Sequence, residues 1–178
     1  GRHDEAISSY TKALSLNANY AEAHSNLGST YKAIGKLNDA EQSISEAIAL
    51  QPNLAVAHNN LGNVLQELGR RADAEASYLK AVALNSHFAD AFWNLVGCSQ
   101  CLEDAVHWVQ QCLIADAEHR RAKLTAVALA YYQGSRSQFD RLTQSELTHD
   151  PYMRSFSWTF SLPDLPDLAG LRTLGRID

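Results

Sequence analysis

Apolar and small side chains recur along this chain every 34 residues. The segment 20–28 (YAEAHSNLG) carries the same residue types, at the same offsets, as segments 54–62 (LAVAHNNLG) and 88–96 (FADAFWNLV). A fixed period of this length is typical of a stacked array of small units rather than a globule around one enclosed core. Arrays of this kind usually present a long curved surface to other proteins.

Each period contains two apolar stripes at helical spacing. With Ala21, Ala55 and Ala89 counted as position 1, the first stripe runs through positions 3, 4, 7, 8 and 11, and the second through 20, 21, 24, 27 and 28. Glycine at position 15, as in Gly35 and Gly69, separates them, because glycine readily adopts the left-handed conformation that ends a helix. The pattern therefore predicts a helical hairpin in each period, with small residues at positions 8, 20 and 27 where helices approach closely.

The phase of the repeat predicts the organisation of the chain. Because residues 1–3 fall in the middle of a period, we expect the chain to be part of a longer array or protein. About three residues are missing before Ala105, and we assign this deletion to a hairpin turn. In order, the predicted units are the second half of a repeat at 1–20, repeats at 21–54 and 55–88, a shortened repeat at 89–119 that ends the regular array (1–119), a degenerate or capping repeat at 120–151, and an aromatic, proline-containing tail at 152–178. The tail either covers or folds back along the array, or begins a following domain.

These marker positions resemble the tetratricopeptide repeat family over residues 1–102. The stretches AEAHSNLGSTYKAIGKLNDA (21–40) and FADAFWNLVGCSQ (88–100) are most similar to the superhelical arrays of O-linked N-acetylglucosamine transferases. The resemblance implies an all-α fold, a right-handed superhelix (solenoid) of antiparallel helix hairpins. It also implies that the first helix of each unit lines the inner groove, through positions 2, 5, 6, 9, 12 and 13.

Asparagine occupies position 6 three times, as Asn26, Asn60 and Asn94. An amide both donates and accepts hydrogen bonds, so a row of amides can hold the backbone of an extended peptide. The transferase resemblance implies this ladder role. The alternative is that these amides stabilise the repeats themselves. The other candidate peptide-binding residues are Asn59, Asn63, Gln66, Trp93, Gln100 and Arg121.

A second kind of groove in this family holds an acidic chain terminus in a clamp of cations and amides. Asn63, Asn94 and Arg121 match that clamp, but Asn59 and Thr125 stand where two cations are required. A doubly charged terminus held by one cation would bind weakly. The clamp is therefore the less favoured of the two grooves.

The composition narrows the possible partners. The chain has 178 residues, 46% of them hydrophobic, and a formal net charge of −5. The acidic balance argues against a nucleic-acid partner, which would need a basic face. No apolar run approaches the roughly 18 residues of a membrane-spanning helix, and no secretory signal is visible. Three cysteines are an odd and small number, so a reducing, cytoplasmic location is expected.

Signals for chemistry are weak. Cys98 and Cys101 form a CxxC that, with His107 and Cys112, could supply four zinc ligands, but cysteine as a small buried residue explains them better. His24 and His58 recur at position 4 and are interpreted as packing residues. We therefore expect no metal, no cofactor and no catalytic residue.

Three functions remain open at this stage. The first is a non-catalytic scaffold that binds a peptide or partner protein in its groove. The second is a substrate-recruiting arm of a larger transferase, a glycosyltransferase rather than a methyltransferase, whose catalytic domain lies outside this sequence. The third is self-assembly into a homo-oligomer through the exposed ends of the array.

Overall fold

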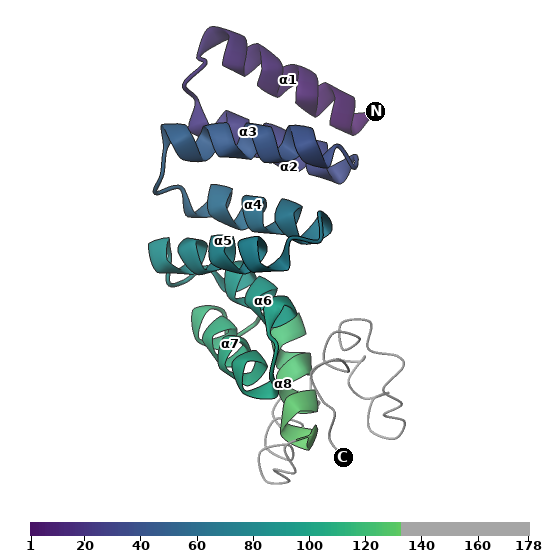
Figure 1. The fold of residues 1–178 in the computed structure, drawn as a ribbon, viewed down its shortest axis with the longest axis vertical. Coiled ribbons are helices and arrows are strands. Elements are labelled where there is room, and N and C mark those ends of the chain that lie inside the picture. Colours follow the sequence, from purple (N-terminus) through teal and green to yellow (C-terminus); the bar gives the residue numbers. More distant parts are fainter. Residues whose placement is uncertain (133–178) are drawn as a thin grey trace. The chain divides into compact units, whose positions relative to one another are not determined.

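The structure, a computed structural model, describes residues 1–132, and within them it contains eight α-helices and no strand. The helices are α1 (Arg2–Leu16), α2 (Ala21–Ala33), α3 (Leu37–Leu50), α4 (Ala55–Glu67), α5 (Arg71–Leu84), α6 (Ala89–Cys98), α7 (Leu102–Ala115) and α8 (Arg120–Tyr132). They belong to two compact units, one of residues Gly1–Cys98 and one that begins at Ser99 (Figure 1). The predicted all-α class is confirmed.

The first unit is a stack of helical hairpins. Each of its six helices packs against the next along the chain, and α2 also contacts α4 (Figure 1). The first helices of successive hairpins, α2, α4 and α6, begin at Ala21, Ala55 and Ala89, which keeps the 34-residue period of the sequence. Periodicity alone therefore located these helices correctly.

The stripe at positions 20, 24 and 27 forms the most buried surface of the second helices. Ala40, Ile44 and Ala47 of α3 are fully buried, and so are Ala74, Tyr78 and Ala81 of α5. Ala57 and Val64 of α4 pack with the α3 stripe in one core cluster. Burying a side chain as large as that of Ile44 contributes about 1.5–3 kcal/mol, and each alanine contributes less.

Close helix packing explains the glycines at position 8. A Cβ atom on Gly28 would lie 2.9 Å from the Ala40 carbonyl oxygen, and one on Gly62 would lie 2.6 Å from Cδ1 of the Tyr78 ring. Both distances are shorter than van der Waals contact. In these two hairpins the helices can approach this closely only because position 8 carries no side chain.

The hairpin turns use glycine for its backbone conformation. Gly35 and Gly69 have φ angles of 77° and 76°, in the left-handed region, and no other described residue has a positive φ. Glycine adopts this conformation without the steric cost that a Cβ brings. The predicted helix end at position 15 is confirmed in these two hairpins.

The deletion in the third repeat lies in a helix, so its assignment to the hairpin turn was wrong. The connections 34–36, 68–70 and 99–101 each have three residues, whereas α6 has 10 residues and α2 and α4 have 13. Three residues are close to one helical turn, so the loss shortens α6 and leaves its apolar phase nearly unchanged. Arg71 caps the C-terminal end of the shortened α6. Its Nε donates to the Cys98 carbonyl oxygen at 3.2 Å, and its Nη2 donates to that of Gly97 at 3.3 Å.

The histidines at position 4 bind the linkers that precede their helices. His24 Nε2 lies 2.9 Å from the Ala18 carbonyl oxygen, and His58 Nε2 lies 2.9 Å from that of Pro52. Both side chains are half-buried, which agrees with their interpretation as packing residues. The hydrogen bonds also fix the angle at which the chain enters α2 and α4.

The second unit is described only for α7 and α8, which pack against each other. Its buried stripe, Ala105, Val109 and Cys112, continues the phase of the repeat. The Cys101 sulfur caps α7 by accepting a hydrogen bond from the Asp104 N–H at 3.4 Å. The rest of the predicted capping repeat and the whole predicted tail, 152–178, lie outside the described residues.

Candidate functional site

Polar side chains link the first helices of successive hairpins. Asn60 of α4 donates from Nδ2 to the Ser25 hydroxyl of α2 at 3.1 Å. Asn94 of α6 donates from Nδ2 to Oδ1 of Asn59 and of Asn63, both on α4, at 2.9 and 3.1 Å. We call the surface formed by these side chains of α2, α4 and α6 the amide face.

The three predicted ladder residues therefore differ from one another. Asn94 uses both of its N–H groups within the array, and Asn60 uses one of its two. Asn26 is exposed, and its amide makes no hydrogen bond within the described part of the chain. For Asn60 and Asn94 this favours the alternative reading, in which the amide stabilises the array. Asn60 and Asn94 each reach a residue 35 positions earlier, and for Asn26 that position precedes Gly1.

Tyr78 of α5 reaches the amide face from inside the array. Its hydroxyl lies 2.9 Å from Oδ1 of Asn63 and 2.9 Å from Oε1 of Gln66. A phenol has one proton, so it donates fully to only one of the two oxygens at a time. Asn63 is held in addition by Asn94, so its orientation is the more firmly fixed. Burial raises the pKa of the Tyr78 hydroxyl, which therefore stays a neutral donor.

The sequence did not indicate this role of Tyr78. Its position, 24, is occupied by Ile44 in the preceding hairpin, and both residues fill the space beside a position-8 glycine. A tyrosine among apolar equivalents was the available signal, because a buried hydroxyl requires a hydrogen-bond partner. The amides at positions 9 and 12 of the same hairpin supply the partners.

Charge on the amide face is partly neutralised within it. Lys32 of α2 pairs with Glu67 of α4 at 3.2 Å, with side chains that are 31% and 48% exposed. A pair this exposed contributes at most about 1 kcal/mol to stability. The pair also engages the one lysine of α2.

The remaining candidate residues are scattered. Trp93 is half-buried on α6, next to Asn94. Gln100 was expected on a groove-facing helix position, but it lies in the connection after α6, because that helix ends at Cys98. Arg121 is exposed in the first turn of α8, in the second unit. Asn59 is buried, with 7% of its surface exposed, where an acid-binding clamp would require a cation.

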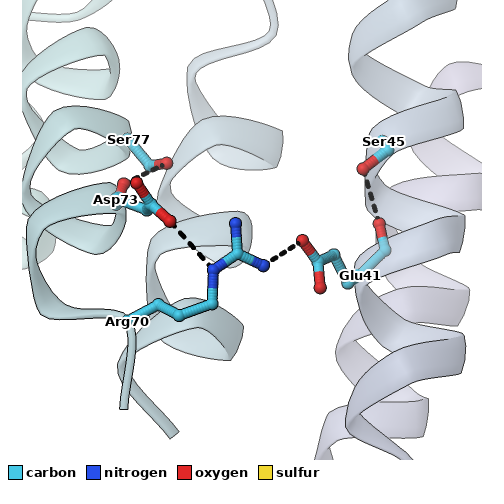
Figure 2. Close-up of polar contacts among 5 residues, drawn as sticks. All are labelled: Glu41, Ser45, Arg70, Asp73 and Ser77. Atoms are coloured by element: carbon cyan, nitrogen blue, oxygen red, sulfur yellow. Dashed lines mark hydrogen bonds and ion pairs between the residues drawn. The ribbon is translucent and has the colours of Figure 1, made fainter. Parts of the chain in front are cut away.

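Side-chain ion pairs link the second helices of two successive hairpins, α3 and α5. Arg70, in the connection before α5, donates from Nε to Asp73 at 2.8 Å and from Nη1 to Glu41 of α3 at 2.7 Å (Figure 2). Ser45 and Ser77 donate to backbone carbonyl oxygens of their own helices beside this network. Hydrogen bonds to Asp73 and then to Glu41 raise the pKa of Arg70. The contact links α3 to the start of α5.

The cysteines separate into buried and exposed thiols. Cys98 and Cys112 are buried and Cys101 is exposed. Burial raises the pKa of Cys98 to about 11, with a smaller contribution from Glu75. Among residues 1–132, no three histidine, cysteine, aspartate or glutamate side chains gather as a metal site would require. No helix in the same part of the chain is long and apolar enough to cross a membrane.

Family comparisons identify the repeat. Three models of the tetratricopeptide repeat match residues 1–35, 21–54 and 55–88. A comparison with curated protein sequences gave no match. The similarity to the transferase arrays in particular stays a prediction.

Several solved structures share the fold. MamA is 25% identical with a TM-score of 0.68, over 82% of this chain and 90% of MamA. YrrB, a tetratricopeptide-repeat protein with an unusual peptide-binding site, is 20% identical with a TM-score of 0.62, over 97% of this chain and 84% of YrrB. The first such domain of Spaghetti (RPAP3), bound to the HSP90 peptide SRMEEVD, is 21% identical with a TM-score of 0.59, over 64% of this chain and 93% of that domain.

Proposed function

From the tetratricopeptide repeats that make up residues 1–88, we propose that this chain is a non-catalytic interaction module that binds an extended segment of a partner protein. The binding surface is the amide face of α2, α4 and α6. The observation that carries the proposal is that amide groups from neighbouring helices lie on this face with hydrogen-bonding capacity to spare. The peptide sites of YrrB and of the RPAP3 domain support it by analogy of fold.

The spare capacity sets the expected affinity. Asn26 offers a whole amide, Asn60 offers an oxygen and one N–H, and Asn63 offers its NH2 group. Each hydrogen bond to a peptide contributes about 0.5–1.5 kcal/mol net. Association itself costs several kcal/mol, so backbone contacts alone give micromolar binding at best. Side-chain contacts, with Trp93 as the aromatic candidate, would add the rest.

The proposed partner is not an acidic chain terminus. Such a ligand needs several unpaired cations, whereas Lys32 is already paired with Glu67 and Asn59 occupies the place of another. A cytoplasmic location, proposed from the cysteine content, would suit a peptide-binding scaffold. The alternative, a recruiting arm of a larger transferase, uses the same face and is decided by the sequence that follows Asp178 in the parent gene.

Peptide display tests the proposal directly. Twelve-residue peptides are selected against the chain, and their affinities are measured by fluorescence anisotropy. Asn26→Ala is the informative variant, because this amide makes no hydrogen bond within the described residues and its loss leaves stability unchanged. We expect binding to weaken about 2- to 12-fold, the effect of one hydrogen bond.

Asn38→Ala is the matched control, an exposed asparagine on α3 away from the amide face. It is expected to bind like the wild type. Failure to select any peptide, or equal losses in the two variants, would contradict the proposal.

A further inference from the structure

A chain of hydrogen bonds runs beneath the amide face. The Tyr78 hydroxyl lies 2.9 Å from Oε1 of Gln66 and 2.9 Å from Oδ1 of Asn63. Asn94 donates from Nδ2 to the same Asn63 oxygen at 3.1 Å and to Oδ1 of Asn59 at 2.9 Å. We call these five residues, joined in the order Gln66, Tyr78, Asn63, Asn94 and Asn59, the amide relay.

The single proton of the Tyr78 hydroxyl restricts how the amide relay is arranged. The hydroxyl lies between two amide oxygens, and its proton can be donated fully to only one of them. The other oxygen then faces a hydroxyl lone pair at 2.9 Å, which is unfavourable. Turning one of the two amides by 180° exchanges its oxygen and nitrogen, so that the hydroxyl has one acceptor and one donor as neighbours.

Asn94 determines which of the two amides turns. If Asn63 turned, its NH2 group would face the NH2 group of Asn94, and Asn94 and then Asn59 would have to turn as well. Asn59 is buried, with 7% of its surface exposed. Gln66 is exposed and makes no other hydrogen bond within the described residues, so it can turn alone. The amide relay is therefore satisfied when Gln66 Nε2 donates to the Tyr78 hydroxyl and the hydroxyl donates to Asn63 Oδ1.

This arrangement fixes what Asn63 and Asn94 can offer to a ligand. The oxygen of Asn63 accepts from both Tyr78 and Asn94, so only its NH2 group remains. Asn94 uses both N–H groups internally, so only its oxygen remains. Every buried side-chain nitrogen and oxygen among the described residues has a partner, so these two remaining groups are reached by solvent. A donor and an acceptor therefore lie on adjacent amides of the amide face.

We propose, building on the proposed function, that Tyr78 is a positioning residue that makes Asn63 and Asn94 a donor–acceptor pair for one residue of an extended ligand backbone. The N–H and C=O of a residue in an extended strand point to the same side. The ligand N–H donates to the Asn94 oxygen, and the ligand C=O accepts from the Asn63 NH2 group. Proline is excluded at this ligand position because it has no N–H.

The pairing belongs to one junction of the described array. In the preceding hairpin, Ile44 and Ser29 stand at the positions of Tyr78 and Asn63. Neither a hydroxyl from the second helix nor an amide at position 9 is present there. The proposed ligand is therefore held in a defined direction between α4 and α6.

Hydrogen exchange of side-chain amides tests the amide relay without a ligand. In 15N-labelled protein, the NH2 group of Gln66 is compared with that of Gln42, an exposed glutamine on α3. We expect Gln66 to exchange about 2- to 12-fold more slowly, the effect of one hydrogen bond, and to lose this protection in Tyr78→Phe. Tyr10→Phe is the control, since the Tyr10 hydroxyl makes no hydrogen bond within the described residues.

The same spectra test the direction of the amide relay. The NH2 group of Asn94 should be protected from exchange, and that of Asn63 should not. The opposite order would overturn the proposed direction. Equal exchange of Gln66 and Gln42 in the wild type would overturn the amide relay itself.

Peptide binding tests the donor–acceptor pair. The probe is the tightest 12-residue peptide selected by display, together with a series that carries an N-methyl group at each residue in turn. We expect N-methylation of one residue to weaken binding about 5- to 150-fold, because it leaves the Asn94 oxygen without a donor. Asn63→Asp should weaken binding of the unmodified peptide by a similar factor. Its carboxylate still accepts from Tyr78 and Asn94, but its outward NH2 group has become an oxygen.

Matched variants separate this effect from charge and from stability. Asn38→Asp adds the same charge on α3 and should bind like the wild type. Tyr78→Phe keeps the ring against Gly62 and removes only the hydroxyl, so binding should weaken about 2- to 12-fold, whereas Tyr10→Phe should leave it unchanged.

The outcomes distinguish this inference from the proposed function. A peptide that binds the wild type and Asn63→Asp equally, or that tolerates N-methylation at every residue, refutes the donor–acceptor pair and leaves the interaction module intact. If no peptide is selected, the proposed function fails and the pair fails with it. The exchange measurement then still decides whether the amide relay exists.

Discussion

Replacing Gly62 by alanine tests the close packing on which the hairpins depend. The new Cβ would lie 2.6 Å from Cδ1 and 2.9 Å from Cζ of the Tyr78 ring. The ring cannot withdraw, because it is fully buried and its hydroxyl is held by Asn63 and Gln66. Overpacking of this kind costs about 1–3 kcal/mol, and because the ring cannot withdraw we expect the upper part of that range, about 2–3 kcal/mol. Alanine returns about 0.8–1 kcal/mol through its higher helix propensity. The expected net loss is therefore about 1–2 kcal/mol.

The assay is thermal and urea unfolding followed by circular dichroism. For a unit of about 100 residues, this loss lowers the midpoint temperature by roughly 5–15 °C. The urea m-value should stay constant if the array still unfolds as one unit. Gly97→Ala in α6 is the matched control, since its Cβ would meet nothing closer than Gln66 Nε2 at 3.5 Å. This variant should equal or exceed the wild type in stability.

The same substitution in a second variant tests whether the Tyr78 ring is the cause of the loss. In a Tyr78→Val variant the ring is absent, so Gly62→Ala should now stabilise the protein by about the helix-propensity difference. The sequence of the third repeat shows the same exchange, with Val96 at position 8 and Val109 at position 24. A Gly62→Ala protein as stable as the wild type, or an equal loss in both backgrounds, would show that the ring does not limit this position.

Three further results are expected. Cys101 should react with a thiol reagent at pH 8, whereas Cys98 should stay protected until urea is added, as mapped by mass spectrometry. Burial raises the pKa of Cys98 to about 11, so the folded protein keeps the thiol proton that the unfolded chain loses. Stability should therefore fall as the pH rises from about 9 to 11. A double-mutant cycle of Ser25→Ala and Asn60→Ala, read by urea unfolding, should give a coupling of about 0.5–1.5 kcal/mol, and zero coupling would refute the inter-helix bond. Gly69→Ala should destabilise by about 1–2 kcal/mol because φ is 76°, and Gly69→Asn should destabilise less.

The fold was predictable because it depends on local pattern. Helix ends at Gly35 and Gly69 follow from backbone sterics at one residue, and the stripe containing Ile44 and Tyr78 follows from helical periodicity. Neither requires knowledge of a distant partner. The deletion in the third repeat was misplaced because a count of residues does not say whether a turn or a helix is shortened. The three-residue connections show that the turn length was kept.

The roles of the amides were not predictable from position alone. Asn60 and Asn94 occupy equivalent places in the repeat, yet Asn60 donates to a serine hydroxyl whereas Asn94 donates to two amide oxygens. The sequence shows which residue types face a groove, whereas the choice of hydrogen-bond partner depends on the side chains of the adjacent hairpin. Asn59 illustrates this, since its predicted groove position is buried against the amide of Asn94.

The two junctions between hairpins use different chemistry, and this difference shapes the binding surface. Between the first two complete hairpins the polar links include two ion pairs, Lys32 with Glu67 and Arg70 with Glu41, beside the neutral bond from Asn60 to Ser25. Between α4 and α6 the amide of Asn94 donates to two neutral amides, those of Asn59 and Asn63. Ion pairs use up the charges of their junction, whereas amides engaged through oxygen still present N–H groups. If the proposed function holds, directional recognition without net charge is expected at the amide junction, because the contacts that hold Asn59 and Asn63 also orient their amides.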